Sequence, residues 1–240
     1  MPGLFKRKKN EAYPYCAAVV AAAGSSTRMG QDKIMLSLAE IPVVVHTLQA
    51  LNNCPYIHEI IVVTREELLV PISKLCADYV LTKVRKVVVG GATRAQSVYM
   101  GVQEVSEQAR LIAIQDGARP LVSQDVLRDV VLMAGKSGAA APAIPVKDTI
   151  KQADGGIVTN TPDREKLFAV QTPQVFEADL IRAALHKAVE EGLPITDDCS
   201  AVELLGMKVT LTKGSDENIK ITTPADLVLA EALLQWRDEK

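Results

Sequence analysis

Short apolar runs alternate with longer amphipathic stretches along most of this chain, and the alternation limits the folds open to it. The apolar runs are rich in β-branched residues or continuously apolar, which is typical of strands buried on both faces. They span residues 17–22, 59–64, 86–89, 110–115 and, more weakly, 139–144. Strands that alternate with helices predict an α/β fold with one open, mostly parallel sheet and helices on both of its faces.

Capping and proline signals place the helices. Pro42 is expected in the first turn of one helix, and Thr93 is expected to cap another. Beyond Lys166 the pattern predicts, in order, a strand, helices over 177–191 and 197–205, a strand near 208–212 and a last helix from Pro224. The alternation thus predicts a single domain over residues 15–240, preceded by a flexible basic leader at 1–14.

One segment, residues 146–164, breaks the alternation. It is polar and holds few large apolar side chains, and Asp154-Gly155-Gly156 stands at its middle. Asp-Gly and Gly-Gly are strong turn signals, so we expect a projecting β-hairpin arm. A hairpin alone is marginally stable in water, so the arm is expected to lean on a second copy of the chain and make a homodimer. The alternative is a mobile surface loop on a monomer.

Composition excludes several partners. The 240 residues carry 27 Lys and Arg against 29 Asp and Glu, so no net positive field would attract nucleic acid. No apolar run approaches the roughly 18 residues of a membrane span, and the short run after the basic residues 6–9 does not make a signal peptide. The cysteines are far apart, which favours reduced structural thiols in a cytoplasmic protein over the alternatives, a disulfide or a zinc site. They are Cys16, Cys54, Cys76 and Cys199.

A loop of small residues, 21–30, follows the first predicted strand directly. Small side chains let backbone N–H groups approach phosphate oxygens, and Arg28 and Lys33 add two cations. In an open α/β sheet such a loop lies at the carboxyl end of the strand, where ligands bind. The loop has too few glycines for a dinucleotide fingerprint and lacks the Gly-Lys-Ser/Thr ending of a P-loop. A plain surface loop is the alternative.

The loop resembles the AAGxxxRMG signature, followed by Lys, of nucleotidyltransferases that activate sugars. Seven further motifs are similar, in the same order, to those of the 2-C-methyl-D-erythritol 4-phosphate cytidylyltransferase family. They are GGATRAQSV at 90–98, DGARP at 116–120, PVKDT at 145–149, Asp163-Arg164, QTPQ at 171–174, Thr196-Asp197-Asp198 and Asn218-Ile219-Lys220. The resemblance runs from about Cys16 to the last helix, and it implies the Rossmann-like fold of nucleotide-diphospho-sugar transferases.

The resemblance implies a role for each matching residue. Arg28, Lys33 and Lys220 would be catalytic cations. The CTP site would comprise Ala22, Ala23, Gly24, Ser25, Gly90, Gly91, Ser97 and Ala118. The acceptor polyol phosphate would contact Arg119, Thr149, Arg164, Thr172 and Thr196, with Arg164 reaching the neighbouring subunit's site. Asp116 ends an apolar strand, where a carboxylate is costly unless it is paired or holds a cation such as Mg²⁺; capping a turn is its alternative role.

The implied activity is transfer of a cytidylyl group from CTP to 2-C-methyl-D-erythritol 4-phosphate in the isoprenoid pathway. Two alternatives remain open: a ribitol 5-phosphate cytidylyltransferase and a non-catalytic nucleotide-sensing domain. The chain departs from the family pattern at Ile34, where many relatives carry Gln, and at Glu40, where Gly is common. Both departures concern local loop geometry and leave the charged residues unchanged.

Overall fold

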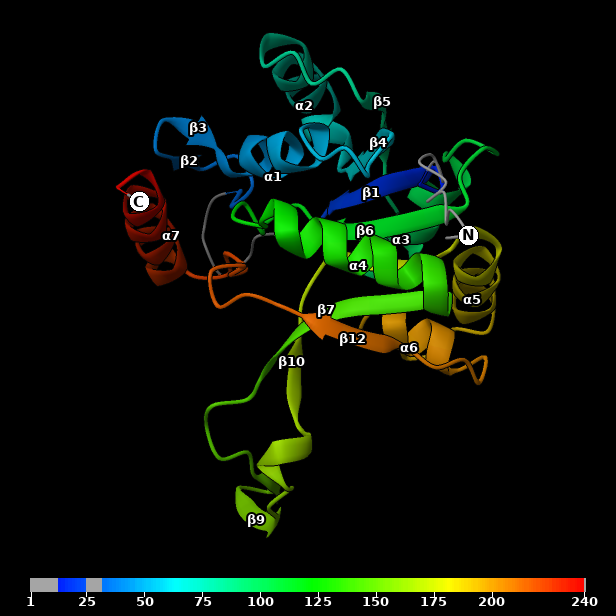
Figure 1. The fold of residues 1–240 in the computed structure, drawn as a ribbon, viewed down its shortest axis with the longest axis vertical. Helices are drawn as coiled ribbons and strands as arrows, with labels where there is room; N and C mark the ends of the chain where they lie inside the picture. The colour runs from blue at the N-terminus through cyan, green and yellow to red at the C-terminus, as the bar shows by residue number, and fades with distance from the viewer. Residues whose placement is uncertain (1–12, 25–31, 240) are drawn as a thin grey trace, which may run out of the picture.

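An eight-stranded sheet forms the centre of the molecule in the computed structural model, which describes residues 13–24 and 32–239 (Figure 1). One half is parallel, in the order β6-β1-β4-β5. Its strands are β1 (Cys16–Ala22), β4 (Glu59–Thr64), β5 (Val84–Val89) and β6 (Leu111–Asp116). The strand predicted at 59–64 is therefore confirmed residue by residue, and the others lie within two residues of their predicted starts.

The other half of the sheet contains its antiparallel members. It comprises β7 (Ala139–Pro145), β10 (Phe168–Val170), β11 (Gln174–Glu177) and β12 (Thr210–Lys213). Strand β11 is antiparallel to both β6 and β7, while β12 runs parallel to β7 at the edge. The predicted open, mostly parallel sheet is confirmed. The sequence pattern indicated only one strand directly after Lys166, whereas the chain forms two, β10 and β11.

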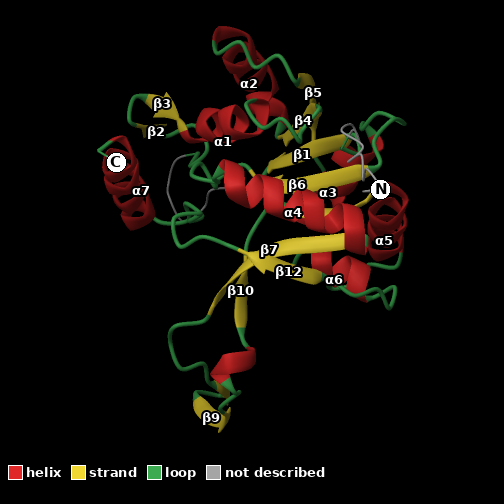
Figure 2. Ribbon diagram, viewed as in Figure 1, coloured by secondary structure: helices red, strands yellow, loops and turns green. Residues whose placement is uncertain are grey.

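Helices cover both faces of the sheet, as Figure 2 shows. One face packs against α1 (Val43–Asn52), α2 (Glu66–Asp78) and α4 (Gln124–Ser137), and the other against α3 (Arg94–Gln103), α5 (Ala178–Glu190) and α6 (Asp198–Glu203). Successive side chains of a strand point to opposite faces. Along β1, accordingly, Ala18 and Val20 belong to the first core, and Ala17 and Val19 to the second.

The chain ends in α7 (Pro224–Asp238), which packs over a small third cluster containing Leu38 and Ile221. Its predicted start is confirmed, since Thr223 is the N-cap and its backbone N–H donates to Asp226 Oδ2 at 2.8 Å. Thr93 caps α3 as expected, because its hydroxyl accepts from Gln96 N at 3.1 Å. None of the helices in the described ranges is long and apolar enough to cross a membrane.

The predicted position of Pro42 is wrong by one residue. Pro42 is the N-cap of α1 and also the last residue of a two-residue strand, so it precedes the first turn. The strands β2 (Ser37–Leu38) and β3 (Ile41–Pro42) form a tight hairpin that the pattern did not predict. Its turn residues Ala39 and Glu40 have φ of 47° and 66°, the left-handed region that Gly adopts without strain.

Residues 146–164 project from the body of the molecule, at the bottom of Figure 1. Strands β8 (Gln152–Asp154) and β9 (Ile157–Asn160) pair antiparallel around Gly155 and Gly156, so the predicted hairpin is confirmed. All residues of both strands are exposed, and Ile157 is 75% exposed. Among the described residues, the single chain therefore gives the two hairpin strands no cover from solvent. Residues 1–12 of the predicted leader lie outside the described residues.

Gly101 in α3 provides a test of how tightly this helix meets the sheet. A Cβ at this position would lie 2.4 Å from Val63 Cγ2 and 2.6 Å from Val19 Cγ1. Gly101→Ala should therefore lower the free energy of unfolding by roughly 1–3 kcal/mol, the usual effect of overpacking a core. Urea denaturation followed by circular dichroism measures it.

The matched control is Gly135→Ala in α4, where the nearest atom to a new Cβ is 3.7 Å away. This substitution should be neutral or stabilise by up to about 1 kcal/mol, because Ala favours a helix over Gly. Equal effects of the two substitutions would contradict the close approach of α3 to the sheet.

Candidate active site

A cleft of about 450 Å³ opens at the carboxyl ends of the parallel strands. This is where ligands bind in open α/β sheets, since loops that leave adjacent strands diverge there. The cleft is lined on one side by the segment after β1, and on the other by residues that follow β5 and β6. The predicted residues in its lining are Ala22, Ala23, Gly24, Lys33, Gly91, Ser97, Asp116, Ala118 and Lys220.

The nucleotide side of the cleft depends on a close approach of two loops. A Cβ on Gly90 would lie 2.6 Å from Ser97 Oγ and 2.9 Å from Ala23 Cβ, so only glycine fits between them. The Ser97 side chain is buried, and its hydroxyl donates to Thr93 O at 2.8 Å. Gly90 itself thus packs behind the cleft, whereas Gly91 and Ser97 line it. Both glycines have a packing reason beyond forming a turn.

Asp116 is the centre of the charged floor of the cleft. Its side chain is largely buried, and Lys220 Nζ lies 2.8 Å from its Oδ2. Arg119 Nε lies 3.7 Å from the same oxygen, and Arg94 Nη2 lies 3.5 Å from Oδ1. Burial alone would raise the pKa of this carboxyl, but the three cations together hold the pKa below its ordinary value. The charge of Asp116 therefore persists at neutral pH, and turn capping does not explain its partners.

Lys220 reaches Asp116 because the segment before α7 is fastened to the end of β6. The backbone N–H of Ile221 donates to Ala118 O at 2.8 Å, and Arg119 Nη1 donates to Asn218 O at 2.6 Å. Asn218 is fully buried and donates to Thr172 O at 2.9 Å. These bonds bring a cation from late in the chain to the cleft, which explains why the motif at 218–220 belongs to the site.

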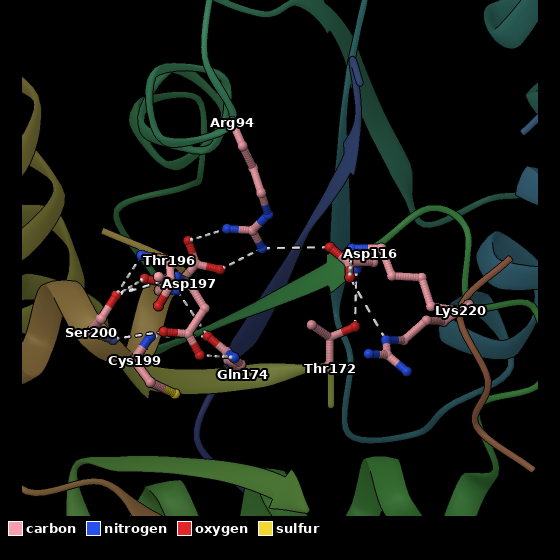
Figure 3. Close-up of polar contacts among 11 residues, drawn as sticks. Arg94, Asp116, Thr172, Gln174, Thr196, Asp197, Cys199, Ser200 and Lys220 are labelled. Atoms are coloured by element: carbon pink, nitrogen blue, oxygen red, sulfur yellow. Dashed lines mark hydrogen bonds and ion pairs between the residues drawn. The ribbon is translucent and has the colours of Figure 1, made fainter. Parts of the chain in front are cut away.

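Arg94 and Asp198 form a strong contact that the sequence reasoning did not assign. Arg94 Nη1 and Nη2 lie 3.1 and 2.7 Å from the two carboxylate oxygens of Asp198, which is fully buried. Figure 3 shows the Arg94 side chain beside the start of α6, with its guanidinium between this segment and Asp116. Burial opposes the charge of Arg94, but the carboxylates of Asp198 and Asp116 outweigh it and raise the pKa of Arg94. A signal was present: Arg94 opens α3, and a cation at a helix N-terminus is opposed by the helix dipole unless it has a partner.

The predicted acceptor residues separate into two groups. Thr172 and Arg119 lie against Asp116, since Asp116 N donates to Thr172 Oγ1 at 3.1 Å. Thr196 is exposed just before α6, where its N–H donates to Ser200 Oγ at 3.1 Å. Thr149 and Arg164 are exposed on the arm, and neither lines the cleft of its own chain. The single chain thus brings together part of the predicted acceptor site.

Two predicted residues, Ser25 and Arg28, lie outside the described residues, and their roles stay predictions. Arg65 was not predicted, but it lines the cleft at the end of β4 and forms ion pairs with Asp32 and Glu67. Ile34, where many relatives carry Gln, is buried and also lines the cleft. The departure at this position therefore changes the wall of the cleft.

The side chains of the cleft suit a hard cation bound by one carboxylate better than a cation coordinated entirely by protein groups. Within the described ranges, no three His, Cys, Asp or Glu side chains are grouped to hold a metal ion. Mg²⁺ commonly takes one or two carboxylates and completes its shell with water and substrate phosphates. Asp116 supplies one such carboxylate in the cleft, and Arg119 Nε is a buried donor with no hydrogen-bond partner among the described residues. The carboxylate fits a cation that arrives with a phosphate ligand, whereas Arg119 does not line the cleft.

Fold and site together define an α/β enzyme of the nucleotidyltransferase class. The comparisons with known proteins narrow this class: residues 16–236 match the family described as IspD, 2-C-methyl-D-erythritol 4-phosphate cytidylyltransferase. A protein of that name from Caldanaerobacter subterraneus is 46% identical over 227 residues, covering 91% of this chain and 98% of the relative. The chain belongs to the 2-C-methyl-D-erythritol 4-phosphate cytidylyltransferase family.

Solved structures agree with this assignment. The 4-diphosphocytidyl-2C-methyl-D-erythritol synthase of Anaerococcus prevotii has a TM-score of 0.83 at 31% identity, covering 92% of this chain and 96% of that one. The 2-C-methyl-D-erythritol 4-phosphate cytidylyltransferase of Thermus thermophilus has a TM-score of 0.76 at 33% identity, covering 92% and 99%. The resemblance found in the motifs is thus confirmed over nearly the whole chain.

The charged floor predicts a pH-dependent stability. Asp116→Asn should lower the free energy of unfolding at pH 7 by about 1–3 kcal/mol, because three cations lose a shared, buried counter-charge. The folded pKa of Asp116 is depressed. Its contribution is therefore complete above the unfolded pKa of about 3.9 and is lost as the pH falls through the lower folded value.

The measurement is urea denaturation of wild type and variant at several pH values. The difference in unfolding free energy should be constant between pH 7 and about pH 5 and should shrink below about pH 4. A difference that widens in acid would show that the carboxylate is not held by these cations.

Proposed function

We propose that this cleft performs its family's reaction, with the 4-phosphate of 2-C-methyl-D-erythritol attacking the α-phosphorus of CTP. The products are 4-diphosphocytidyl-2-C-methyl-D-erythritol and pyrophosphate, and the reaction belongs to the isoprenoid pathway. The observation that carries the proposal is the meeting of Lys33, Lys220 and Asp116 in one cleft beside the small-residue segment 22–24. Cations and close backbone N–H groups are what a triphosphate requires.

The chemistry asks mainly for positioning and charge neutralisation. A phosphate monoester is largely ionised near neutral pH, so the acceptor needs no general base to act as a nucleophile. It must, however, approach a polyanion. Arg28 and Lys33 are proposed to hold the α-phosphate, and Lys220, which also lines the cleft, is proposed to meet the incoming phosphate. Gly91 and Ser97 are proposed to read the cytosine edge.

Asp116 is proposed to hold Mg²⁺ together with triphosphate oxygens. The bound ion would supply further positive charge to the phosphates. Lys220 and Arg119 stay on the Oδ2 side of the carboxylate, which orients the other oxygen relative to the cleft. The protein's own contribution is thus a fixed carboxylate among cations, of which Lys220 and Arg94 line the cleft.

The acceptor site is proposed to be completed by the arm of a second chain. Thr172 and Arg119 lie near Asp116, whereas Thr149 and Arg164 are carried on the projecting arm. Exposed apolar side chains on and beside the arm support an interface, because a solvated hairpin gains little from them. They are Ile150, Ile157, Val158, Phe168 and Val170. Arg164 of one subunit would then reach the polyol phosphate held by its neighbour.

A reducing compartment such as the cytoplasm is proposed for the protein. Cys16, Cys54 and Cys199 are buried and Cys76 is half-buried, all as free thiols. Burial raises the pKa of Cys76 to about 11. Such thiols are unreactive and suit a protein whose stability does not depend on disulfides.

A direct assay tests the proposed reaction. The purified chain should release pyrophosphate from CTP and Mg²⁺ when 2-C-methyl-D-erythritol 4-phosphate is present, at least about tenfold faster than with ribitol 5-phosphate, because a site that pairs polar groups with one substrate penalises another. Faster turnover of ribitol 5-phosphate would favour that alternative. Nucleotide binding without any turnover would favour a sensing domain.

Subunit mixing tests the shared acceptor site. Lys33→Ala and Arg164→Ala should each reduce turnover at least about tenfold, because each removes a cation that stabilises transferring charge. After subunit exchange of an equal mixture, turnover should recover to about a quarter of wild type per chain, since half of the dimers are mixed and each has one intact site. Sizing and a tag-based pull-down verify the exchange. No recovery in verified mixed dimers would rule out site sharing through Arg164.

A further inference from the structure

Asp198 is a buried charge for which the reaction as described has no use. It is the first residue of α6, it has no exposed surface, and both of its carboxylate oxygens lie on Arg94. Burying an ion pair costs several kcal/mol of desolvation per ion, and an apolar pair of similar size is often as stable. The pair therefore invites an explanation other than stability alone.

The backbone around Asp198 is fixed to the sheet by Gln174. The Gln174 Oε1 atom accepts from the N–H groups of Asp198 and Cys199 at 3.0 and 2.9 Å, and its Nε2 donates to Asp197 Oδ2 at 2.7 Å. Gln174 opens β11, which pairs with β6, the strand that ends in Asp116. The separation between the two carboxylates is thus set by the sheet, and Arg94 spans it.

Arg94 contacts the carboxylate of Asp198 more closely than the carboxylate of Asp116. Its Nη2 atom lies 2.7 Å from Asp198 Oδ2 and 3.5 Å from Asp116 Oδ1. In Figure 3 a dashed line joins Arg94 to Asp116. Charge-assisted hydrogen bonds of this kind are commonly about 2.7–2.9 Å long. Arg94 is therefore engaged by Asp198 and only touches Asp116. A movement of less than about 1 Å would close the second contact fully.

The two oxygens of Asp116 consequently differ. Oδ2 is engaged by Lys220 at 2.8 Å, with Arg119 Nε at 3.7 Å. Oδ1 has the long contact to Arg94. Since Asp116 and Arg94 both line the cleft, Oδ1 is the oxygen that a cation arriving with a nucleotide would meet with the least competition.

We propose that Asp198 is a positioning residue that holds Arg94 back from Asp116, so that Asp116 Oδ1 stays available to a divalent cation bound with the nucleotide. The inference rests on the proposed role of Asp116 in holding Mg²⁺. It assigns to Asp198 a function that requires no contact with substrate: it competes with Asp116 for one guanidinium.

Without the charge of Asp198, Arg94 should be free to move onto Asp116. In Asp198→Asn the side chain loses its charge and one of its two acceptor oxygens, and its amide NH2 cannot accept, so the paired contact of two oxygens with two guanidinium nitrogens is lost. Arg94 then closes onto Asp116 Oδ1 and competes with the divalent cation. Replacing Arg94 by Gln in the same chain removes the competitor. The double variant Arg94→Gln/Asp198→Asn should therefore recover what Asp198→Asn loses.

Calorimetry with the α,β-methylene analogue of CTP measures this without turnover. The Kd of the analogue is determined in EDTA and in Mg²⁺, and the ratio of the two values is the coupling between metal and nucleotide. The free energy of contacts that the analogue makes equally in EDTA and in Mg²⁺ cancels in this ratio. Wild type should give a ratio well above one, and Asp116→Asn should give a ratio near one.

The expected result is a ratio at least about threefold lower in Asp198→Asn, with recovery to within about twofold of wild type in the double variant. An unchanged ratio in Asp198→Asn, or a double variant as low as the single one, overturns the proposal. A wild-type ratio of one overturns the metal role of Asp116, and the inference with it, which separates the two failures.

Two further variants keep the test decisive. Circular dichroism and thermal melting show whether Asp198→Asn folds, and if it does not, Asp198→Glu keeps the buried charge while moving the guanidinium towards Asp116. The same fall in the ratio is then expected, and an unchanged ratio overturns the proposal. Glu104→Gln, which removes the surface pair of Glu104 with Lys86 (2.7 Å) at the other end of α3, should leave the ratio at its wild-type value.

Discussion

One buried carboxylate, Asp116, keeps cations from three separate segments of the chain side by side. Lys220 Nζ, Arg94 Nη2 and Arg119 Nε all lie within 2.8 to 3.7 Å of its two oxygens. Without a shared counter-charge these side chains would repel one another in a region with little water to screen them. One negative charge thus orders the cations at the floor of the cleft. The position of Asp116 at the end of a central strand makes that charge rigid.

The sheet decides how the cleft is supported. Strand β6 lies between β1, which carries the small-residue segment, and the antiparallel β11, which begins with Gln174. Gln174 holds the start of α6, and Thr172, just before β11, accepts from the backbone of Asp116. The groups predicted to bind the nucleotide and those predicted to bind the acceptor are thus fastened to neighbouring strands. A small displacement in either strand would change the spacing of the charges, which is the quantity that phosphoryl chemistry depends on.

The arm, unlike the body of the molecule, is not stabilised by a buried core within the single chain. In the body, β1, β4 and β6 are buried along almost their whole length, whereas β8 and β9 are exposed along theirs. A hairpin of this size gains too little from its own contacts to be stable alone. A second chain would supply the missing apolar contacts and would, in the proposed dimer, receive Arg164 in return. The same dimer contact would then both stabilise the arm and complete the acceptor site.

The sequence by itself determined the class of fold, the approximate positions of the parallel strands and the start of the last helix. Alternating periodicity specified the parallel strands, and the order of the motifs specified the family. These features are local, so a linear pattern contains them. Only the tertiary structure decided that Lys220 meets Asp116, that β11 enters the sheet antiparallel, and that Pro42 caps α1 from a small hairpin. It alone paired Arg94 with Asp198, which lies 104 residues away. Such pairings depend on how strands are ordered and helices are packed, and neither spacing nor composition encodes the distance between two side chains that are remote in the chain.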